Sequence, residues 1–225
     1  MREVSFESVS YSYPKERSGT ALRRVFDNLS IRLSPGRIYV MTGPNGSGKS
    51  TFARLMAGII CPDGGRVLIG GRNMKVESLP DVGRAVGYVM QDPSRQLITA
   101  NPVEEVSFGL RNWGMPKAAA AAMAESALRD FGLLHTRDTH VQRLSKGEKV
   151  RLALASVSVL NPDWLILDES LASLDSDSRS IVIGRLEALR ETGRGVLAIT
   201  HSPMLAEEMK GMKIAAEKGG NMLVG

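Results

Sequence analysis

Short apolar runs alternate along the chain with longer amphipathic stretches, a pattern that predicts strands alternating with helices. Four runs are rich in β-branched and aromatic residues and are typical of buried strands. They cover residues 37–42, 86–90, 164–167 and 195–200. Apolar residues at helical spacing predict helices over residues 50–57, 103–113, 116–131, 149–160 and 178–189. This alternation favours an α/β fold with a mainly parallel sheet.

The N-terminal third and the C-terminal tail have a different pattern. Residues 2–13 predict an antiparallel edge strand, residues 25–33 a second strand, and residues 14–24 a polar loop between them. A short strand is predicted over residues 66–69. Residues 212–224, with a Gly-Gly pair in the middle, predict a terminal hairpin. We therefore expect an antiparallel β part beside the parallel core.

Residues 92–160 separate two of the core strands and contain three of the predicted helices. We interpret this segment as a helical subdomain inserted into a catalytic core made of residues 1–91 and 161–225. Because 225 residues fall in the usual range for one domain, the whole chain is predicted to be a single domain.

Composition narrows the class of protein. Hydrophobic residues make up 43% of the chain and charged residues 24%, as in an ordinary globular protein. The net charge of +5 comes without a long basic run, so direct binding of nucleic acid is not expected. The lone Cys61 excludes an internal disulfide and suits a reducing compartment. Since no apolar run approaches the length of a membrane span, we expect a cytoplasmic protein that reaches a membrane only through a partner.

A glycine-rich run follows the first predicted core strand. It fits the pattern G-x-x-x-x-G-K-[ST] of a phosphate-binding P-loop and consists of Gly43, Pro44, Asn45, Gly46, Ser47, Gly48, Lys49, Ser50 and Thr51. Glycines let backbone N–H groups wrap phosphate oxygens, and the N-terminus of the next helix favours negative charge. Lys49 can reach the β- and γ-phosphates, and the Ser50 hydroxyl can ligate Mg²⁺. The alternative is a glycine-rich turn that binds nothing.

The other three core strands end in polar groups that could carry phosphate chemistry. Gln91 follows one strand, Asp168 and Glu169 the next, and His201 the last. Ligands of open α/β sheets bind at the carboxyl ends of the strands, so the fold rule brings these groups to the P-loop. Asp168 could hold Mg²⁺ beside Ser50, and Glu169 could accept the proton of an attacking water.

Gln91 could orient that water or touch the metal, and His201 could bond the γ-phosphate and position the base. The alternatives are solvated acids at a strand end, a polar loop residue and a packed histidine. Ser145 and Gly147 open a predicted helix, where a hydroxyl and free N–H groups make a second anion site or an ordinary N-cap.

Together these motifs resemble, over nearly the whole chain, the nucleotide-binding ATPase subunit of an ABC transporter. The order is P-loop, Q-loop Gln91, a signature at residues 144–148 similar to L-S-G-G-Q, a Walker B strand, a D-loop at residues 172–175 and the switch His201. The resemblance implies ATP and Mg²⁺ as ligands and two subunits that face head to tail. Ser145 and Gly147 would then complete the partner's site, with Asp175 of the D-loop among the residues that bind nucleotide.

The same resemblance suggests a tyrosine that stacks on adenine. Tyr13 at the end of the first strand is the candidate, Tyr11 on the same face competes with it, and the alternative is that both pack the sheet. Four positions depart from the family pattern. Within the signature, Lys146 replaces a glycine and Glu148 a glutamine; outside it, Ser170 follows Glu169 where proline is common, and Ala172 replaces the D-loop serine.

Residues 89–97 and 103–109 carry a narrower resemblance, to the energy-coupling-factor ATPases that drive uptake of vitamins, cobalt or nickel. It implies integral membrane subunits as partners and a place on the inner face of the cell membrane. Leu97 and Ile98 lie outside the apolar face of the following helix, so we hypothesise that they form a groove for a membrane subunit. The alternative is that they pack under the loop.

Other functions were weighed against a transporter motor. A soluble ABC-type ATPase of DNA repair would carry a long coiled coil between P-loop and signature, where this sequence has no sustained heptads. ABC ATPases of translation normally carry two cassettes, and this sequence shows one. A regulatory module that only binds nucleotide is disfavoured by Glu169 and His201. A GTPase is disfavoured by the absence of an N-K-x-D motif from the sequence.

Overall fold

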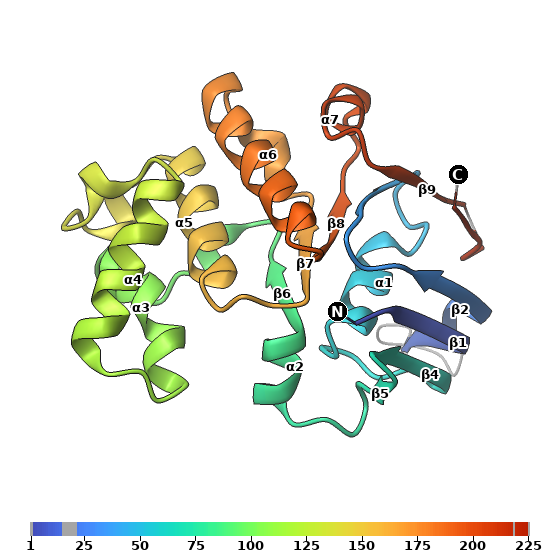
Figure 1. The fold of residues 1–225 in the computed structure, drawn as a ribbon. Helices are drawn as coiled ribbons and strands as arrows, with labels where there is room; N and C mark the ends of the chain where they lie inside the picture. Colours follow the sequence, from blue (N-terminus) through green and yellow to red (C-terminus); the bar gives the residue numbers. More distant parts are fainter. Residues whose placement is uncertain (1, 15–21, 218, 225) are drawn as a thin grey trace.

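A computed structural model describes residues 2–14, 22–217 and 219–224, and it contains two sheets (Figure 1). The larger sheet has the strand order β10-β9-β3-β8-β7-β6. Its strands are parallel except for the terminal hairpin strand β10. The bounds are β3 Ile38–Thr42, β6 Val86–Val89, β7 Trp164–Asp168, β8 Gly195–Ile199, β9 Met212–Ala216 and β10 Met222–Val224. The predicted α/β fold is confirmed, and all four expected core strands are neighbours in this sheet.

The smaller sheet is antiparallel, with the order β2-β1-β4-β5. Its strands are β1 Val4–Pro14, β2 Leu22–Leu33, β4 Gly64–Ile69 and β5 Arg72–Asn73. The prediction that the first strand forms an edge is wrong, because β1 pairs with β2 on one side and β4 on the other. Alternation of side chains reveals the two faces of a strand but not how many of its edges are paired. The predicted loop 14–24 is also too long, since β2 already begins at Leu22; residues 15–21 lie outside the described residues.

Seven α-helices are present in the described part of the chain. Five match the predicted ones: α1 Lys49–Met56, α3 Pro102–Asn112, α4 Lys117–Asp130, α5 Lys146–Ser158 and α6 Ser176–Glu191. The other two, α2 Leu79–Ala85 and α7 Pro203–Glu208, have only 7 and 6 residues, too few for a helical period to emerge. All elements between β6 and β7 are helical, and in Figure 1 α3 and α4 lie at the opposite end of the molecule from β1, β2 and β4.

The parallel sheet separates two hydrophobic clusters, and β7 shows how. Trp164 and Ile166 pack into a cluster with α1 and the antiparallel sheet, whereas Leu165 and Leu167 pack into a cluster with α5, α6 and the helical subdomain. All five residues of β7 are buried, as expected of a central strand covered on both faces. The strand ends that carry functional groups are therefore held rigidly from two sides.

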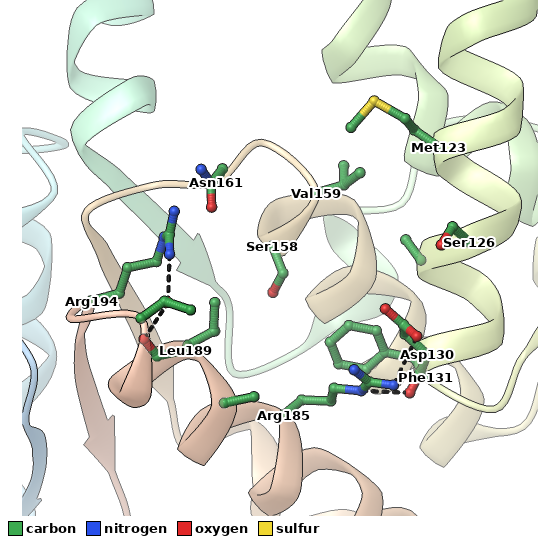
Figure 2. Close-up of a pocket in the computed structure, with 13 residues that line it drawn as sticks. Met123, Ser126, Asp130, Phe131, Ser158, Val159, Asn161, Arg185, Leu189 and Arg194 are labelled. Atoms are coloured by element: carbon green, nitrogen blue, oxygen red, sulfur yellow. Dashed lines mark hydrogen bonds and ion pairs between the residues drawn. The ribbon is translucent and has the colours of Figure 1, made fainter.

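The helical subdomain is joined to the core where α4 meets α6, at a crevice of about 500 Å³ (Figure 2). Arg185 on α6 donates through Nε to the Asp130 carbonyl at 2.9 Å and through Nη2 to its carboxylate at 2.8 Å. From α5, Arg151 Nη1 donates to the Phe131 carbonyl at 2.8 Å. Arg185 from the core and Arg151 from within the subdomain thus hold the C-terminal end of α4.

Candidate functional site

The loop between β3 and α1 has the shape of a phosphate cradle. Gly46 and Gly48 have φ values of 79° and 96°, a left-handed conformation that favours glycine. A Cβ on Gly43 would lie 2.2 Å from the Ala216 carbonyl oxygen, and one on Gly48 would lie 2.9 Å from the Phe26 ring. A side chain at Gly43 or Gly48 would therefore clash with these neighbours. The helix α1 starts at Lys49 without a side-chain cap, so its first N–H groups face the loop.

Lys49 and Ser47 give this loop its polarity. Lys49 Nζ donates to the carbonyls of Gly43 at 2.9 Å and Pro44 at 3.0 Å, and the residue is 5% exposed. Burial lowers the pKa of Lys49, and the charges of Glu169 and Asp168 act in the opposite direction. The Ser47 hydroxyl is buried without a hydrogen-bond partner among the described residues.

Asp168 ends β7 and connects it to α1. Its Oδ1 accepts a hydrogen bond from Ser50 Oγ at 3.0 Å, and its Oδ2 accepts one from Tyr88 Oη at 2.6 Å. The sequence predicted the pairing of Asp168 with Ser50 but not the contribution of Tyr88. The sequence feature that could have indicated this contribution is a polar hydroxyl, that of Tyr88, inside an otherwise apolar strand that leads directly to Gln91.

Glu169 lies between the other two strand-end groups. Gln91 Nε2 donates to Glu169 Oε2 at 3.0 Å, and His201 Nε2 lies 2.7 Å from Glu169 Oε1. Glu169 has φ = 54°, a left-handed conformation that is unusual for a non-glycine residue. The structure thus brings Gln91, Glu169 and His201 together. Gln91 contacts Glu169 here rather than Ser50 or Asp168.

A cavity of about 370 Å³ connects Gln91 and Glu169 to the P-loop, and its wall consists of Asn45, Gly46, Gly48, Lys49, Ser50, Thr51, Gln91 and Glu169. His201 lines a separate cavity of about 230 Å³ on the side of Thr42 and Gly43. The donor set fits a triphosphate, because it combines an ammonium, hydroxyls and a glycine cradle with the orphaned Ser47 hydroxyl next to it. The oxygens of Ser50 and Asp168 are hard ligands of the kind that Mg²⁺ takes.

Tyr13 and Arg23, its partner on the adjacent strand, both lie beside the P-loop. Thr51 Oγ1 lies 3.5 Å from Tyr13 Oη, and the Tyr11 ring meets the Tyr13 ring edge-to-face at 4.9 Å. Tyr11 packs against the core, which leaves Tyr13 as the tyrosine nearer the loop. Arg23, opposite Tyr13 in the sheet, was predicted to be a loop residue; a Cβ on Gly46 would lie 3.0 Å from its Nη2.

Ser145, Gly147 and Asp175 form a second cluster, and none of them lines the P-loop cavity. Ser145 caps α5 in a reciprocal capping box with Glu148, with bonds of 2.8 and 3.2 Å. Asp175 caps α6 through the Ser178 N–H at 2.7 Å. A Cβ on Gly147 would lie 3.7 Å from Asp175 Oδ2, so the cap of α6 adjoins the start of α5.

Comparison with known proteins gives the family. The family model described as "ABC transporter" matches residues 26–172. The chain belongs to the ABC transporter family. This ABC chain is 35% identical over 200 residues to the energy-coupling factor transporter ATP-binding protein EcfA1 of Fusobacterium nucleatum, covering 88% of the chain and 73% of the relative. It is 34% identical over 220 residues to EcfA1 of Bacillus licheniformis, covering 97% and 76%.

The chain covers a smaller share of a third relative. An ABC transporter ATP-binding protein of Methanosarcina acetivorans is 35% identical over 89% of the chain, which spans 33% of that relative's length. Among solved structures, CbiO1 of Clostridium perfringens, part of the ABC transporter complex CbiONQ, is 27% identical with a TM-score of 0.84, over 98% of this chain and 86% of that one. The ATP-binding cassette MJ0796, a dimer bound to ADP and Pi, has a TM-score of 0.85 at 22% identity over 98% of each chain, a likeness in fold. The predicted resemblance to ABC and energy-coupling-factor ATPases is confirmed.

Proposed function

We propose that this ABC ATPase hydrolyses ATP with Mg²⁺ and energises a membrane importer of the energy-coupling-factor type, for a vitamin or a transition-metal ion. The observation that carries the proposal is the placement of Glu169 beside the P-loop cavity, with one carboxylate oxygen on Gln91 and the other on His201. The similarity to two EcfA1 proteins supports the importer type.

Each group of the site has a role in this proposal. Lys49 and the P-loop amides bind the phosphates, and Ser50 and Asp168, assisted by Gln91, hold Mg²⁺. The metal neutralises charge on the phosphate oxygens when it is bound. Glu169 accepts the proton of the attacking water, Gln91 orients that water, and His201 fixes Glu169 and reaches toward the γ-phosphate. Tyr13 stacks on the adenine.

The second cluster belongs to a partner's site in this proposal. Ser145, Gly147 and Asp175 do not line the P-loop cavity of their own chain. The hydroxyl and amide donors at the start of α5 suit an anionic ligand, and the exposed Lys146 adds a positive charge next to them. Two chains facing head to tail, identical or homologous, would bring each cluster to the nucleotide of the other.

A second cavity suits the membrane partner. It measures about 490 Å³ and lies beside Gln91, with Ile59, Ile60 and Met90 as its apolar part. The hypothesis that Leu97 and Ile98 help form a groove for a membrane subunit stays a prediction. Leu97 is half-buried against the helical cluster, Ile98 is exposed, and neither of them lines this cavity. No helix in the described residues is long and apolar enough to cross a bilayer. We place the protein at the inner face of the cell membrane, held there by its partners.

The test is Glu169→Gln, which keeps size and shape but cannot accept the proton. We expect ATP binding at wild-type strength, hydrolysis slower by at least about a hundredfold, and an ATP-dependent dimer in light scattering. Glu191→Gln, an exposed glutamate at the end of α6, is the control and should behave as wild type. Wild-type turnover in Glu169→Gln would exclude Glu169 as the base, and a monomer in saturating ATP would argue against the head-to-tail site.

A further inference from the structure

Tyr88 and Ser50 together occupy both oxygens of the Asp168 carboxylate. Tyr88 Oη donates to Oδ2 at 2.6 Å, and Ser50 Oγ donates to Oδ1 at 3.0 Å. Asp168 is only 5% exposed, so water cannot replace a lost donor freely. The orientation of this carboxylate therefore depends on two hydroxyl groups from two different elements, α1 and β6.

The Tyr88 hydroxyl is the donor in its contact with Asp168. Burial raises its pKa, the hydrogen bond to Asp168 and the charge of Asp168 raise it further, and nearby Arg54 lowers it less. An ionised carboxylate can only accept, so this short contact is a charge-assisted hydrogen bond with a fixed direction.

The ring that carries this hydroxyl is itself fixed. Tyr88 pairs with Ile166 across the β6–β7 ladder, and its ring packs against the core cluster on the α1 side of the sheet. Gln96 holds the backbone on both sides of Val89, because its Nε2 donates to the Tyr88 carbonyl at 3.0 Å and its Oε1 accepts from Met90 N at 3.1 Å. A tyrosine held at both its ring and its backbone can impose an orientation on its partner.

We propose that Tyr88 is a positioning residue that fixes Asp168 in the orientation from which Asp168 and Ser50 hold Mg²⁺. This inference rests on the proposed magnesium site. Tyr88, Gln96 and Asp168 all line the 490 Å³ cavity beside Gln91. A partner that enters this cavity therefore meets the group that orients the metal ligand, which gives the cavity a direct structural connection to the nucleotide site.

Tyr88→Phe tests the proposal, because it deletes one hydroxyl and keeps the ring. We expect the affinity for Mn²⁺ in the presence of ATP, measured from the electron paramagnetic resonance signal of free Mn²⁺, to fall about tenfold. Binding of a fluorescent ATP analogue in EDTA should remain at wild-type strength. The Mg²⁺ concentration for half-maximal hydrolysis should rise in proportion to the loss of Mn²⁺ affinity.

Tyr39→Phe is the matched control, since Tyr39 is a buried tyrosine on strand β3 of the same sheet, and its Oη accepts from Ser34 N at 2.9 Å. It loses a structural hydrogen bond without touching Asp168, so Mn²⁺ affinity should not change. In an Asp168→Asn background, Tyr88→Phe should cause no further loss, because the group it orients is gone.

The outcomes separate this inference from the proposed function. Wild-type Mn²⁺ affinity in folded Tyr88→Phe, or an equal loss in Tyr39→Phe, would overturn the role of Tyr88 and leave the magnesium site intact. Wild-type Mn²⁺ affinity in Asp168→Asn would overturn the magnesium site itself and this inference with it. A tenfold loss confined to Tyr88→Phe and absent from the double variant would support both.

Discussion

The charged ammonium group of Lys49 is shielded from water. Its ammonium is buried, bonds two carbonyls of its own loop, and has a pKa lowered by burial. Carbonyl dipoles compensate a buried charge only in part, so a phosphate oxygen with a full negative charge is a better partner for Nζ. The loop thus places the Lys49 ammonium group where it can bind an anion in the cavity.

Lys49→Ala should therefore weaken ATP binding by roughly tenfold to a hundredfold, the value of one or two charge-assisted hydrogen bonds. The fold should persist, because the variant also removes a buried charge. Binding of a fluorescent ATP analogue measures the loss, and Lys117→Ala, at the exposed start of α4, serves as the control. Equal ATP affinity in the two variants would refute the P-loop assignment.

At the scale of single elements, the N-terminus of α5 is stabilised by ionised Glu148. Partial burial opposes its ionisation, but hydrogen bonds from Ser145 and the neighbouring His135, 3.5 Å away, outweigh burial and lower the pKa of Glu148. A lowered carboxyl pKa contributes stability above the unfolded value of about 4.5, and this contribution is lost as the pH falls through the folded value. The helix cap is therefore sensitive to acid.

Glu148→Gln keeps an amide that can still accept from Ser145 but removes the charge. At pH 7 we expect the variant to melt about 1–3 °C below wild type, since the pair with His135 is exposed and contributes little. As the pH falls below 4.5 and through the lowered folded pKa, the two melting curves should approach each other, because Glu148 becomes protonated in the wild type as well. Circular dichroism melts at pH 7 and pH 3.5 measure the gap; a gap that stays constant or widens in acid would contradict this account.

The sequence predicted those helices and strands well in which the hydrophobic pattern extends over enough residues to be recognised. Apolar runs located β3, β6, β7 and β8, and the rule that ligands bind at strand ends placed Gln91, Glu169 and His201 at one site. It failed where a decision depends on distant pairing. Whether β1 is an edge strand depends on β4, some fifty residues later, and the short helices α2 and α7 have only 7 and 6 residues.

Side-chain detail inside regular elements was the other part that the sequence did not predict. Tyr88 lies in a strand that reads as apolar, and only the register of β6 against β7 shows that its hydroxyl reaches Asp168. Leu97 looked free because it falls outside the apolar face of α3, yet it packs against the helical cluster. Contacts between elements decide such positions, and a pattern along one element cannot contain them.

At the scale of the whole molecule, the cavity beside Gln91 joins the core to the helical subdomain. Ile59 follows α1, and Met90 and Gln96 come from the segment that leaves β6 for the helices. Ile59 and Met90 are 56% and 41% exposed, an unusual position for large apolar side chains next to a nucleotide site. A short amphipathic helix from a membrane subunit would cover both side chains.

Ile59→Arg should consequently abolish co-purification with the membrane subunits and leave folding unchanged, because the Ile59 side chain is exposed and an arginine there stays in contact with water. A charge placed in a buried apolar contact costs several kcal/mol, enough to lower partner affinity by more than about a hundredfold. Ile98→Arg is the matched control, since Ile98 is exposed to a similar degree but lies outside the cavity. If Ile98→Arg loses the partners and Ile59→Arg keeps them, the docking surface lies on the helical subdomain. If both variants keep them, the membrane partner binds at neither surface.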